Sequence, residues 1–533
     1  MKNIKAFFLS DISNMRMVYF FLFIFAFIAQ CLVVYNGLHE DLLTVLTESI
    51  RIQNGQTVYQ DYTSHNSPIT GILLSFFIDL FSIGFGYILL SALGNALITV
   101  IMAKVVYRIT SSIRLSLMSG LLISVWFFVQ VGGWYYDHVA YFFALMSAAL
   151  FVFFEVKNKY ILFIIGVLLG ISFWSKPTVG VVSGFALVLP ILFIYLKYWK
   201  KILIIIYGGL ASIIFGVLLI YTYSDILSFF QSFVFNSLEY ADHSDNKKIF
   251  FILESFLIPY HMNLLDIFYG RHFGALIFYL TIVILIYVTY LVFFFKREFI
   301  YKNKSLLIFC YFIVLSSIMS SSIVGRNFMQ AVFGLPAMVS LIFYILANGR
   351  IKSIRFKYVY IVTAILFLVA LAYVYKNFND SKGHFINYTN EYEYYPIKLN
   401  QTYLPFADIK NLVEVADYLK NKSGKIAMYD DNARILAALL NRPSWNTGLT
   451  QMYNITIPID KEKRIVWQEK EIEHLQKNKV EWVVSTLNSS KRAFRIQHQS
   501  PPGFLDIEVL SKYIKNKFLL TKVMGSIEIY KRK

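Results

Sequence analysis

The chain has 533 residues, of which 57% are hydrophobic, 18% aromatic and only 15% charged. Soluble globular proteins carry roughly 25% charged residues, so this composition excludes an ordinary soluble domain and favours a protein with many membrane spans. The formal net charge of +18 is typical of basic cytoplasmic loops, and no basic stretch has the aromatic spacing of a strand-binding groove. Nucleic acid is therefore not an expected partner.

The chain has two cysteines, Cys31 and Cys310, and both lie in apolar segments. This excludes a disulfide framework and a cysteine-based zinc site. The histidines do not show a metal-ligand spacing such as His-x-x-x-His, so a metal site is only weakly supported. We expect no cofactor, and a divalent metal is left open but unsupported.

Long apolar runs predict that most of the chain is transmembrane helix. Residues 1–16 lack a small-residue cleavage site, and the apolar run after them is long enough to remain a span, so they do not resemble a cleaved signal. A bilayer requires about 20 apolar residues for each crossing. We predict about eleven spans, at residues 17–36, 84–107, 115–131, 134–154, 160–175, 177–196, 202–223, 273–295, 305–323, 328–347 and 357–375.

The distribution of lysine and arginine predicts which side each loop faces. Alternate loops are rich in basic residues, and cytoplasmic loops carry the positive excess. The N-terminus is therefore predicted to be cytoplasmic, and an odd number of spans places the tail from about residue 376 outside. The predicted cytoplasmic set is Lys2, Lys5, Arg16, Lys104, Arg108, Arg114, Lys157, Lys159, Lys197, Lys200, Lys201, Lys296, Arg297, Lys302, Lys304, Arg350, Lys352, Arg355 and Lys357.

Two outer loops are long, at residues 37–83 and 224–272. In the first, EDLLTVLTESIRI (40–52) places Leu42, Leu43, Leu46 and Ile50 on one helical face and polar residues on the other. This pattern predicts an amphipathic helix lying in the membrane interface and ending at Gly55. A second apolar helix follows over 67–82, with Ser67-Pro68 as its N-cap and first position.

The tail, residues 376–533, changes character. Short apolar stretches at 425–430, 480–486, 518–524 and 526–532 predict strands, and amphipathic stretches at 408–422 and 460–478 predict helices. The predicted fold class is a polytopic α-helical membrane protein, formed by residues 1–375, with interfacial helices on its outer face and a C-terminal extracytoplasmic α/β domain. The tail has no glycine-rich phosphate loop, so a nucleotide-binding role is unsupported.

The ionisable residues at span ends gather on the predicted outer side. They are Glu40, Asp41, Asp61, His65, Asp137, His138, Lys176, Arg271, His272 and Arg326. Charges facing lipid are costly, so such a gathering indicates a site on that face. The competing interpretation is that each residue anchors a span end, and that Glu40 and Asp41 are placed by the dipole of the helix they open. Lys176, flanked by Trp174 and Pro177, suits an anionic partner such as a phosphate, or it snorkels to the interface.

Several of these segments together resemble a known family. They are HED (39–41), IQNGQTVYQDYTSHNSPITGILL (52–74), YYDHVAYFF (135–143), GVLLGISFWSKPTVG (166–180) and GRNFMQAVFGLPAMVSLI (325–342). Their order and spacing resemble the membrane glycosyltransferases of the C superfold, in the branch of the dolichyl-phosphate-mannose protein mannosyltransferases and the bacterial lipid A aminoarabinose transferases. The resemblance covers most of residues 1–375. Two departures are Glu40-Asp41 in place of the family's frequent Asp-Glu, and Gln330-Ala331 in place of its His-Tyr pair.

The resemblance implies transfer of a sugar from a polyprenyl-phosphate donor to an acceptor hydroxyl on the outer face. Asp41, with Glu40 as the alternate, is then the expected base, and Asp137 orients the acceptor or assists. Lys176, with Arg271 or Arg326, is expected to bind the donor phosphate. Tyr59, Asp61, His65 and His138 are the expected substrate-binding residues. The implied partners are the donor, a glycan, lipid or protein acceptor, and membrane lipid, and the implied location is the plasma (inner) membrane.

A transporter or flippase is the main alternative from another class. Against it, no predicted span centre carries an obvious acid or charge pair, and the sequence has no internal repeat with broken helices. The sequence leaves the sugar and the acceptor open: lipid A, O-antigen, another envelope glycan and a protein hydroxyl all remain compatible with it.

Overall fold

The structure is a computed structural model of the whole chain. It describes residues 13–35, 40–62, 64, 68–125, 133–223, 226–230, 304–324, 385–390, 393–398, 406–429, 433–447, 461–485, 508–525 and 527–533. The chain divides into two compact units. Unit 1 comprises residues 1–34, 88–217 and 248–380, and unit 2 comprises residues 35–87, 218–247 and 381–533.

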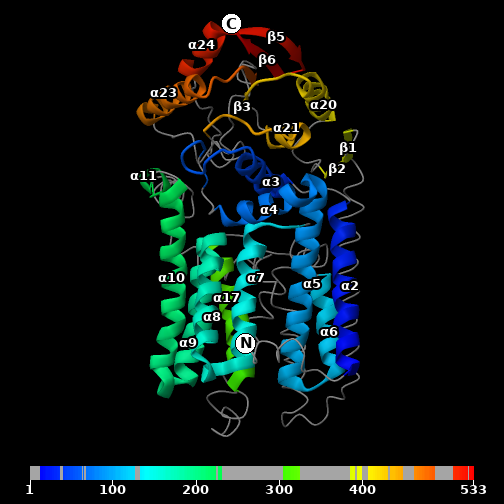
Figure 1. Cartoon of the computed structure of the whole chain (residues 1–533), viewed down its shortest axis with the longest axis vertical. Helices are drawn as coiled ribbons and strands as arrows, with labels where there is room; N and C mark the ends of the chain where they lie inside the picture. Colours follow the sequence, from blue (N-terminus) through cyan, green and yellow to red (C-terminus); the bar gives the residue numbers. More distant parts are fainter. Residues whose placement is uncertain are drawn as a thin grey trace, which may run out of the picture. The chain divides into compact units, whose positions relative to one another are not determined.

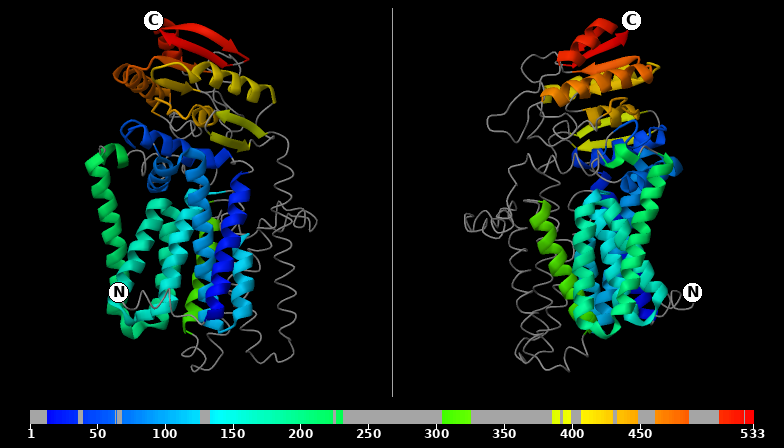
Figure 2. Two further views of the ribbon diagram at one scale, coloured as in Figure 1. Left: turned by 45° about the vertical axis from the view of Figure 1, so that its right-hand side comes forward. Right: turned by 90° about the vertical axis from the view of Figure 1, so that its left-hand side faces the viewer.

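Unit 1 is built from long apolar helices that run side by side (Figures 1 and 2). Helix α7 packs on α8, α9 and α17, and α17 also lies along α9. The helices are α2 (Ser13–Tyr35), α5 (Ile83–Thr110), α6 (Ile113–Ser124), α7 (Tyr136–Phe154), α8 (Lys159–Ser175), α9 (Pro177–Ile194), α10 (Trp199–Tyr223) and α17 (Lys304–Val324). Two short 3-10 helices, η1 (Glu155–Lys157) and η2 (Leu196–Tyr198), follow α7 and α9.

Within the described residues, five helices are long and apolar enough to cross a membrane: Met15–Val33, Ile83–Thr110, Tyr136–Lys157, Pro177–Ile194 and Leu196–Tyr221. Each matches a predicted span. Shorter apolar helices lie at the predicted spans 160–175 and 305–323. Helix α6 covers the first part of the predicted span 115–131, and residues 126–131 lie outside the described residues. The predicted spans 273–295, 328–347 and 357–375 lie outside the described residues.

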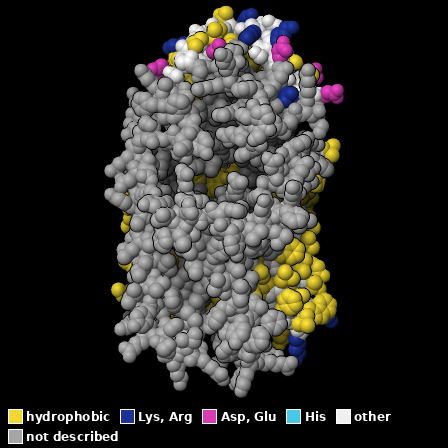
Figure 3. All heavy atoms as spheres, turned by 180° about the vertical axis from the view of Figure 1, so that it is seen from behind, with side chains coloured by type: hydrophobic (Ala, Val, Ile, Leu, Met, Phe, Trp, Pro, Cys, Tyr) yellow, Lys and Arg dark blue, Asp and Glu magenta, His cyan; other side chains and the backbone are white. Residues whose placement is uncertain are grey.

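Large hydrophobic side chains remain exposed along these helices, as expected for surfaces that face lipid. On α10, Tyr207, Leu210, Ile214 and Phe215 are 49–62% exposed. Hydrophobic side chains also form a patch on the lower part of the face seen from behind, with lysine and arginine beyond its end (Figure 3).

Helices α8 and α10 approach closely because glycines line their contact. A Cβ atom at Gly166 would collide with the backbone carbonyl oxygen of Ile205, and one at Gly208 would collide with the carbonyl oxygen of Phe163. In lipid, the hydrophobic effect does not drive helices together, and small residues at the contact let two helix backbones pack closely. The glycine-rich stretch at 166–180 thus has a packing role on α8.

Unit 2 combines the first outer loop with the tail. The loop contributes α3 (Glu40–Gln53) and α4 (Ile69–Phe81), which pack on each other, and α11 (Ile226–Phe229) also belongs to this unit. The tail contributes β1 (Phe385–Asn390), β2 (Glu393–Lys398), α20 (Phe406–Lys420), β3 (Ile426–Tyr429), α21 (Ala433–Leu440), α23 (Lys461–Lys477), β4 (Trp482–Ser485), α24 (Glu508–Lys517), β5 (Phe518–Met524) and β6 (Ile527–Arg532).

The tail strands form a four-stranded sheet in the order β3-β4-β6-β5, while β1 and β2 form a separate antiparallel pair. Strands β3 and β4 are parallel, and the other neighbours in the sheet are antiparallel. Burial of both faces explains the continuous apolar runs of β3 and β4. Leu475, Val483, Leu510 and Ile514 form part of the core between this sheet and its helices.

The strands and helices predicted in the tail are present as β3, β4, β5, β6, α20 and α23, within a few residues of the predicted bounds. The β1–β2 pair, α21 and α24 were not predicted. In the first outer loop, α4 begins at Ile69 with Pro68 as its N-cap, so the predicted assignment of Pro68 to the first helical position is wrong by one residue.

Helix α3 exists at the predicted residues, but its polar side is not exposed. Thr47, Glu48 and Arg51, which we expected on an open polar face, are 0% exposed, as are the apolar residues of the other face. The helix packs on both α4 and α21, so both of its faces are covered within unit 2. The expectation of a polar face open to the membrane interface is therefore wrong for these residues.

Candidate functional site

Asp137 and Lys176 form an ion pair at one end of the unit 1 helices. Helix α7 begins at Tyr136, so Asp137 lies in its first turn, where the helix dipole favours an acid. Lys176 lies between α8 and α9 with an extended backbone (φ −151°, ψ 112°), the conformation that a following proline favours. Pro177 then begins α9 at the helical position where proline is best tolerated.

Backbone and side-chain hydrogen bonds hold the α8–α9 junction against its neighbours. The Ser172 hydroxyl donates to the carbonyl oxygen of Ala140 on α7 at 2.8 Å. The Lys176 amide donates to the carbonyl oxygen of Ser172 at 3.0 Å. The Trp174 indole donates to the carbonyl oxygen of Ser212 on α10 at 3.2 Å. Lys176 is thus fixed relative to α7 and α10, and its ammonium reaches the Asp137 carboxylate.

The exposure of the pair is uneven. The side chain of Asp137 is 7% exposed and that of Lys176 is 19% exposed. Desolvation makes a buried ion pair weak evidence for stability, and charges at membrane-helix positions usually mark functional sites. Because the ammonium is the more accessible partner, an anion can approach Lys176 while Asp137 holds it in position.

A hydroxyl that the sequence analysis did not single out lies beside this lysine. The Oγ1 atom of Thr178, in the first turn of α9, is buried and makes no hydrogen bond within the described residues. The amide groups of the first turn of a helix also have no partner inside that helix, which makes this end favourable for an anion. The Lys-Pro-Thr order was the available signal, because it places a hydroxyl at the start of a helix next to a cation.

His138 follows Asp137 in the chain and is 1% exposed. Its ring lies edge-on to the ring of Tyr135, with 6.4 Å between centroids. The charge of Lys176 acts on it electrostatically. The structure thus brings together three of the predicted site residues, Asp137, His138 and Lys176, in unit 1.

The remaining described candidates belong to unit 2. Glu40 and Asp41 open α3, as predicted, and their side chains lie outside the described part of the structure. Tyr59 and Asp61 share one turn: Tyr59 has a φ of 66°, its amide donates to the carbonyl oxygen of Tyr62 at 2.7 Å, and Asp61 Oδ2 accepts from the Thr57 amide at 2.8 Å. Asp61 therefore has a turn-stabilising contact in addition to its predicted binding role.

Burial raises the pKa values of the two tyrosines in this turn, Tyr59 and Tyr62. The pKa of Tyr59 is raised well above 10.0 by burial and, secondarily, by the charge of Glu48. The pKa of Tyr62 is also raised well above 10.0 by burial and then by Glu48, with Arg51 opposing the shift. The Arg51 guanidinium lies over the Tyr62 ring at 4.8 Å, and Tyr59 packs edge-on against Phe229 at 5.2 Å. Both phenols are therefore neutral across the physiological range.

Arg51 joins this loop to the tail. Its guanidinium donates to Asn446 twice, at 3.0 Å to the backbone oxygen and at 2.6 Å to Oδ1. Gln56 donates to the Ser444 carbonyl oxygen at 3.1 Å. Asn446 in turn donates to the carbonyl oxygen of Met428 on β3 at 3.0 Å. The loop that carries Glu40, Asp41, Tyr59 and Asp61 is thereby fastened to the edge of the tail sheet.

The other predicted residues, His65, Arg271 and Arg326, lie outside the described residues. Within the described ranges, no three His, Cys, Asp or Glu side chains are close enough together to bind a metal ion.

Comparison with known proteins gives little further guidance. No protein-family model matches the chain, and no curated protein matches it. Among solved structures, the chain is similar to the crystal structure of ArnT from Cupriavidus metallidurans bound to undecaprenyl phosphate, with 10% sequence identity, 98% of both chains covered and a TM-score of 0.44.

Proposed function

We propose that this protein is a membrane glycosyltransferase that transfers a sugar from a polyprenyl-phosphate donor to an acceptor hydroxyl on the outer face of the membrane. The proposal rests on the Asp137–Lys176 ion pair, in which the Asp137 side chain is buried and the Lys176 side chain is partly exposed. The pair places the Lys176 cation at the end of an apolar helix bundle. The polyprenyl tail of the donor can lie along the apolar helices while its phosphate binds the cation. The Thr178 hydroxyl and the start of α9 add donors beside that cation.

The residues have separate roles in this proposal. A carboxylate accepts the proton of the acceptor hydroxyl as its oxygen attacks the anomeric carbon, and the bond from that carbon to the phosphate oxygen breaks. The departing polyprenyl phosphate keeps the electron pair, and its negative charge is stabilised by Lys176, with Arg271 or Arg326. Asp41 is the proposed base and Glu40 the alternate. Asp137 holds Lys176 and assists in orienting the acceptor.

The remaining parts of the proposal concern location and substrates. The end of unit 1 that carries Asp137 and Lys176 is assigned to the outer face by the lysine and arginine distribution. Tyr59, Asp61, His65 and His138 are proposed to contact the sugar or the acceptor. The protein is proposed to reside in the plasma (inner) membrane, with the tail outside, and to act on a cell-envelope glycan, lipopolysaccharide, O-antigen or protein.

The test is an assay of the purified full-length protein with an undecaprenyl-phosphate sugar and an extract of envelope acceptors. Release of undecaprenyl phosphate together with a glycosylated acceptor supports the proposal. Movement of the sugar across proteoliposomes without cleavage of the sugar–phosphate bond would instead identify a transporter.

The base assignment has its own pair of variants. Asp41→Asn is expected to reduce transfer by about 10²–10⁴-fold, the usual contribution of a general base, whereas Glu40→Gln is expected to retain most activity. Transfer by Asp41→Asn within a few-fold of wild type, at equal protein level, would remove Asp41 from the mechanism. The reverse pattern would assign the base to Glu40.

A further inference from the structure

A cavity at the other end of unit 1 is lined by cations. It has a volume of about 500 Å³ and is formed where α5, α7, α9 and α17 end or begin. Asp137 lies in the first turn of α7 and Glu155 follows the last, so at 1.5 Å per residue the cavity is roughly 27 Å from the Asp137–Lys176 pair. The lining residues are Arg108, Ile109, Val152, Glu155, Val156, Lys157, Tyr195, Tyr198, Lys201, Lys304, Ser305 and Leu306.

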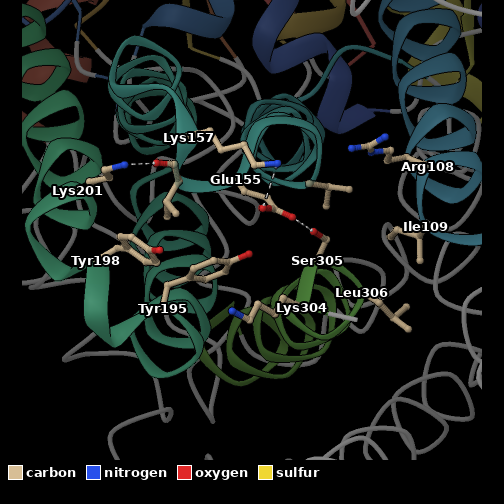
Figure 4. Close-up of a pocket in the computed structure, with 12 residues that line it drawn as sticks. Arg108, Ile109, Glu155, Lys157, Tyr195, Tyr198, Lys201, Lys304, Ser305 and Leu306 are labelled. Atoms are coloured by element: carbon tan, nitrogen blue, oxygen red, sulfur yellow. Dashed lines mark hydrogen bonds and ion pairs between the residues drawn. The ribbon is translucent and has the colours of Figure 1, made fainter. Parts of the chain in front are cut away.

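The cavity carries four cationic side chains and one carboxylate, which leaves its lining with a formal charge of +3. All four cations, Arg108, Lys157, Lys201 and Lys304, belong to the set predicted to be cytoplasmic. The carboxylate of Glu155 lies 3.8 Å from the Lys157 ammonium and accepts a hydrogen bond from Ser305 at 3.1 Å. Figure 4 shows Tyr195, Lys157 and Ser305 turned toward this carboxylate.

Two lysines of the cavity contact aromatic rings. The Lys201 ammonium donates to the Val156 carbonyl oxygen at 3.1 Å and lies 5.5 Å from the centre of the Tyr198 ring. The Lys304 ammonium lies 4.8 Å from the centre of the Tyr195 ring. A carbonyl oxygen and an aromatic ring orient the Lys201 cation without cancelling its charge. Arg108, on the opposite side of the cavity in Figure 4, is exposed and has no ion-pair partner among the described residues.

We propose that this cavity binds a phosphate group at the cytoplasmic end of the helix bundle, and that the group belongs to the head of an anionic membrane lipid. Its volume falls in the range of small-molecule sites. Basic pockets between membrane helices on the cytoplasmic side are the usual receptors for lipid head groups. The exposed apolar helices around it, including Leu196 and Phe193 at 64% and 80%, provide a surface on which acyl chains can lie. This site is separate from the proposed reaction on the other face.

The test uses the purified full-length protein and two probes, phosphatidylglycerol and inorganic phosphate. Retention of each probe is measured by native mass spectrometry, with phosphatidylcholine, which is zwitterionic and has no net charge, as the reference lipid. Selective retention of phosphatidylglycerol supports the lipid assignment. Saturable binding of inorganic phosphate with equal affinity would show that the phosphate group alone is recognised and would overturn the lipid assignment. Retention no greater than that of phosphatidylcholine would overturn the site itself.

Neighbouring lysines provide matched variants. Lys201→Gln, in the cavity, and Arg108→Gln are each expected to weaken phosphatidylglycerol binding about fivefold, from roughly 1 kcal/mol per basic residue. Lys200→Gln removes the same charge from the next residue, whose ammonium lies near Trp199 and does not line the cavity. An equal loss in Lys200→Gln would assign the effect to general surface charge and overturn the proposal.

Glu155→Gln separates binding from folding. Removing the carboxylate leaves all four cations and raises the positive charge of the lining, so phosphatidylglycerol binding is expected to tighten severalfold. A merely structural role for Glu155, through Ser305 and Lys157, predicts the opposite direction. Weaker binding in this variant, with an unchanged elution profile, would contradict the site.

Discussion

The guanidinium of Arg51 donates two hydrogen bonds to Asn446, 395 residues further along the chain. Both residues are almost completely buried, at 0% and 1% exposed. The bidentate contact fastens the helix that begins with Glu40 and Asp41 to the sheet formed by the tail. The tail therefore contributes to the position of the residues proposed as the catalytic base, which gives it a role beyond that of an appended domain.

Replacement of Arg51 by alanine is expected to loosen α3. The variant removes the guanidinium donor from both oxygens of Asn446, although the Ser444 hydroxyl still donates to Oδ1 at 2.9 Å. Hydrogen bonds that involve a charged group contribute roughly 1.5–3 kcal/mol. Hydrogen–deuterium exchange of the full-length protein should show faster exchange in peptides covering Glu40–Gln53 and Ser444–Thr447. Arg51→Lys should recover little, because lysine lacks the planar fork that reaches both oxygens.

Gln53→Ala is the control for this change, since Gln53 is exposed on the same helix. It should leave exchange unchanged. Equal protection of α3 in the wild type and in Arg51→Ala would show that packing on α4 and α21 holds the helix without the Arg51 contact.

The limits of sequence reasoning are visible in the same helix. Its periodicity gave the correct bounds, because an apolar stripe at helical spacing is a local signal. The neighbours that cover α3 could not be predicted from this local pattern. Arg51 and Glu48 belong to the polar side of the predicted interfacial helix, whereas both are buried in the structure. Glu48 lies against Gly71 of α4, and Arg51 donates to Asn446, a residue far along the chain. A polar residue paired with a distant partner has the same local pattern as an exposed one.

The candidate site also has features that the sequence predicted and features that only the structure shows. Span ends and the charge distribution predicted only that Asp137, His138 and Lys176 lie on the same side of the membrane, since antiparallel apolar helices bring alternate ends together. The direct pairing of Asp137 with Lys176 needed coordinates. Thr178 was missed because a single hydroxyl has no periodic signal. The Lys-Pro-Thr order places it beside a cation, but the burial of its Oγ1 without a hydrogen bond needed coordinates.

The α8–α10 contact predicts a sharp difference between two glycine-to-alanine changes. Gly166→Ala places a methyl group against the backbone at Ile205, and a backbone contact cannot yield as a flexible side chain does. Overpacking of this kind costs about 1–3 kcal/mol, so the apparent Tm in detergent should fall by several degrees. Gly184→Ala, on α9, meets nothing within 4 Å and should be neutral or slightly stabilising. Equal Tm values for the two variants would exclude close backbone packing at Gly166.

The buried tyrosines predict a loss of stability in alkali. The folded-state pKa of Tyr59 is raised well above its ordinary value of 10.0. The folded protein therefore holds the phenolic proton more tightly than the unfolded chain does. This stabilisation is fully present below pH 10 and is lost as the pH rises through the folded-state pKa. Tyr59→Phe cannot ionise, so exchange in peptides around residue 59 should rise less steeply above pH 10 than in wild type. An identical pH profile in both proteins would show that Tyr59 does not control alkaline opening.

Variants of Asp137 and Lys176 can separate the structural role of this ion pair from its proposed role in transfer. Asp137→Asn leaves a largely buried ammonium without its carboxylate, which should reduce both the apparent Tm and transfer. Lys176→Gln should reduce transfer by about 10²–10³-fold, because it removes the cation proposed to stabilise the departing phosphate. The double exchange Asp137→Lys with Lys176→Asp retains an ion pair but puts a carboxylate beside Thr178 and the start of α9. We expect it to regain thermal stability without regaining transfer, measured as release of undecaprenyl phosphate. Recovery of both would show that the pair serves folding alone and that the donor phosphate binds elsewhere.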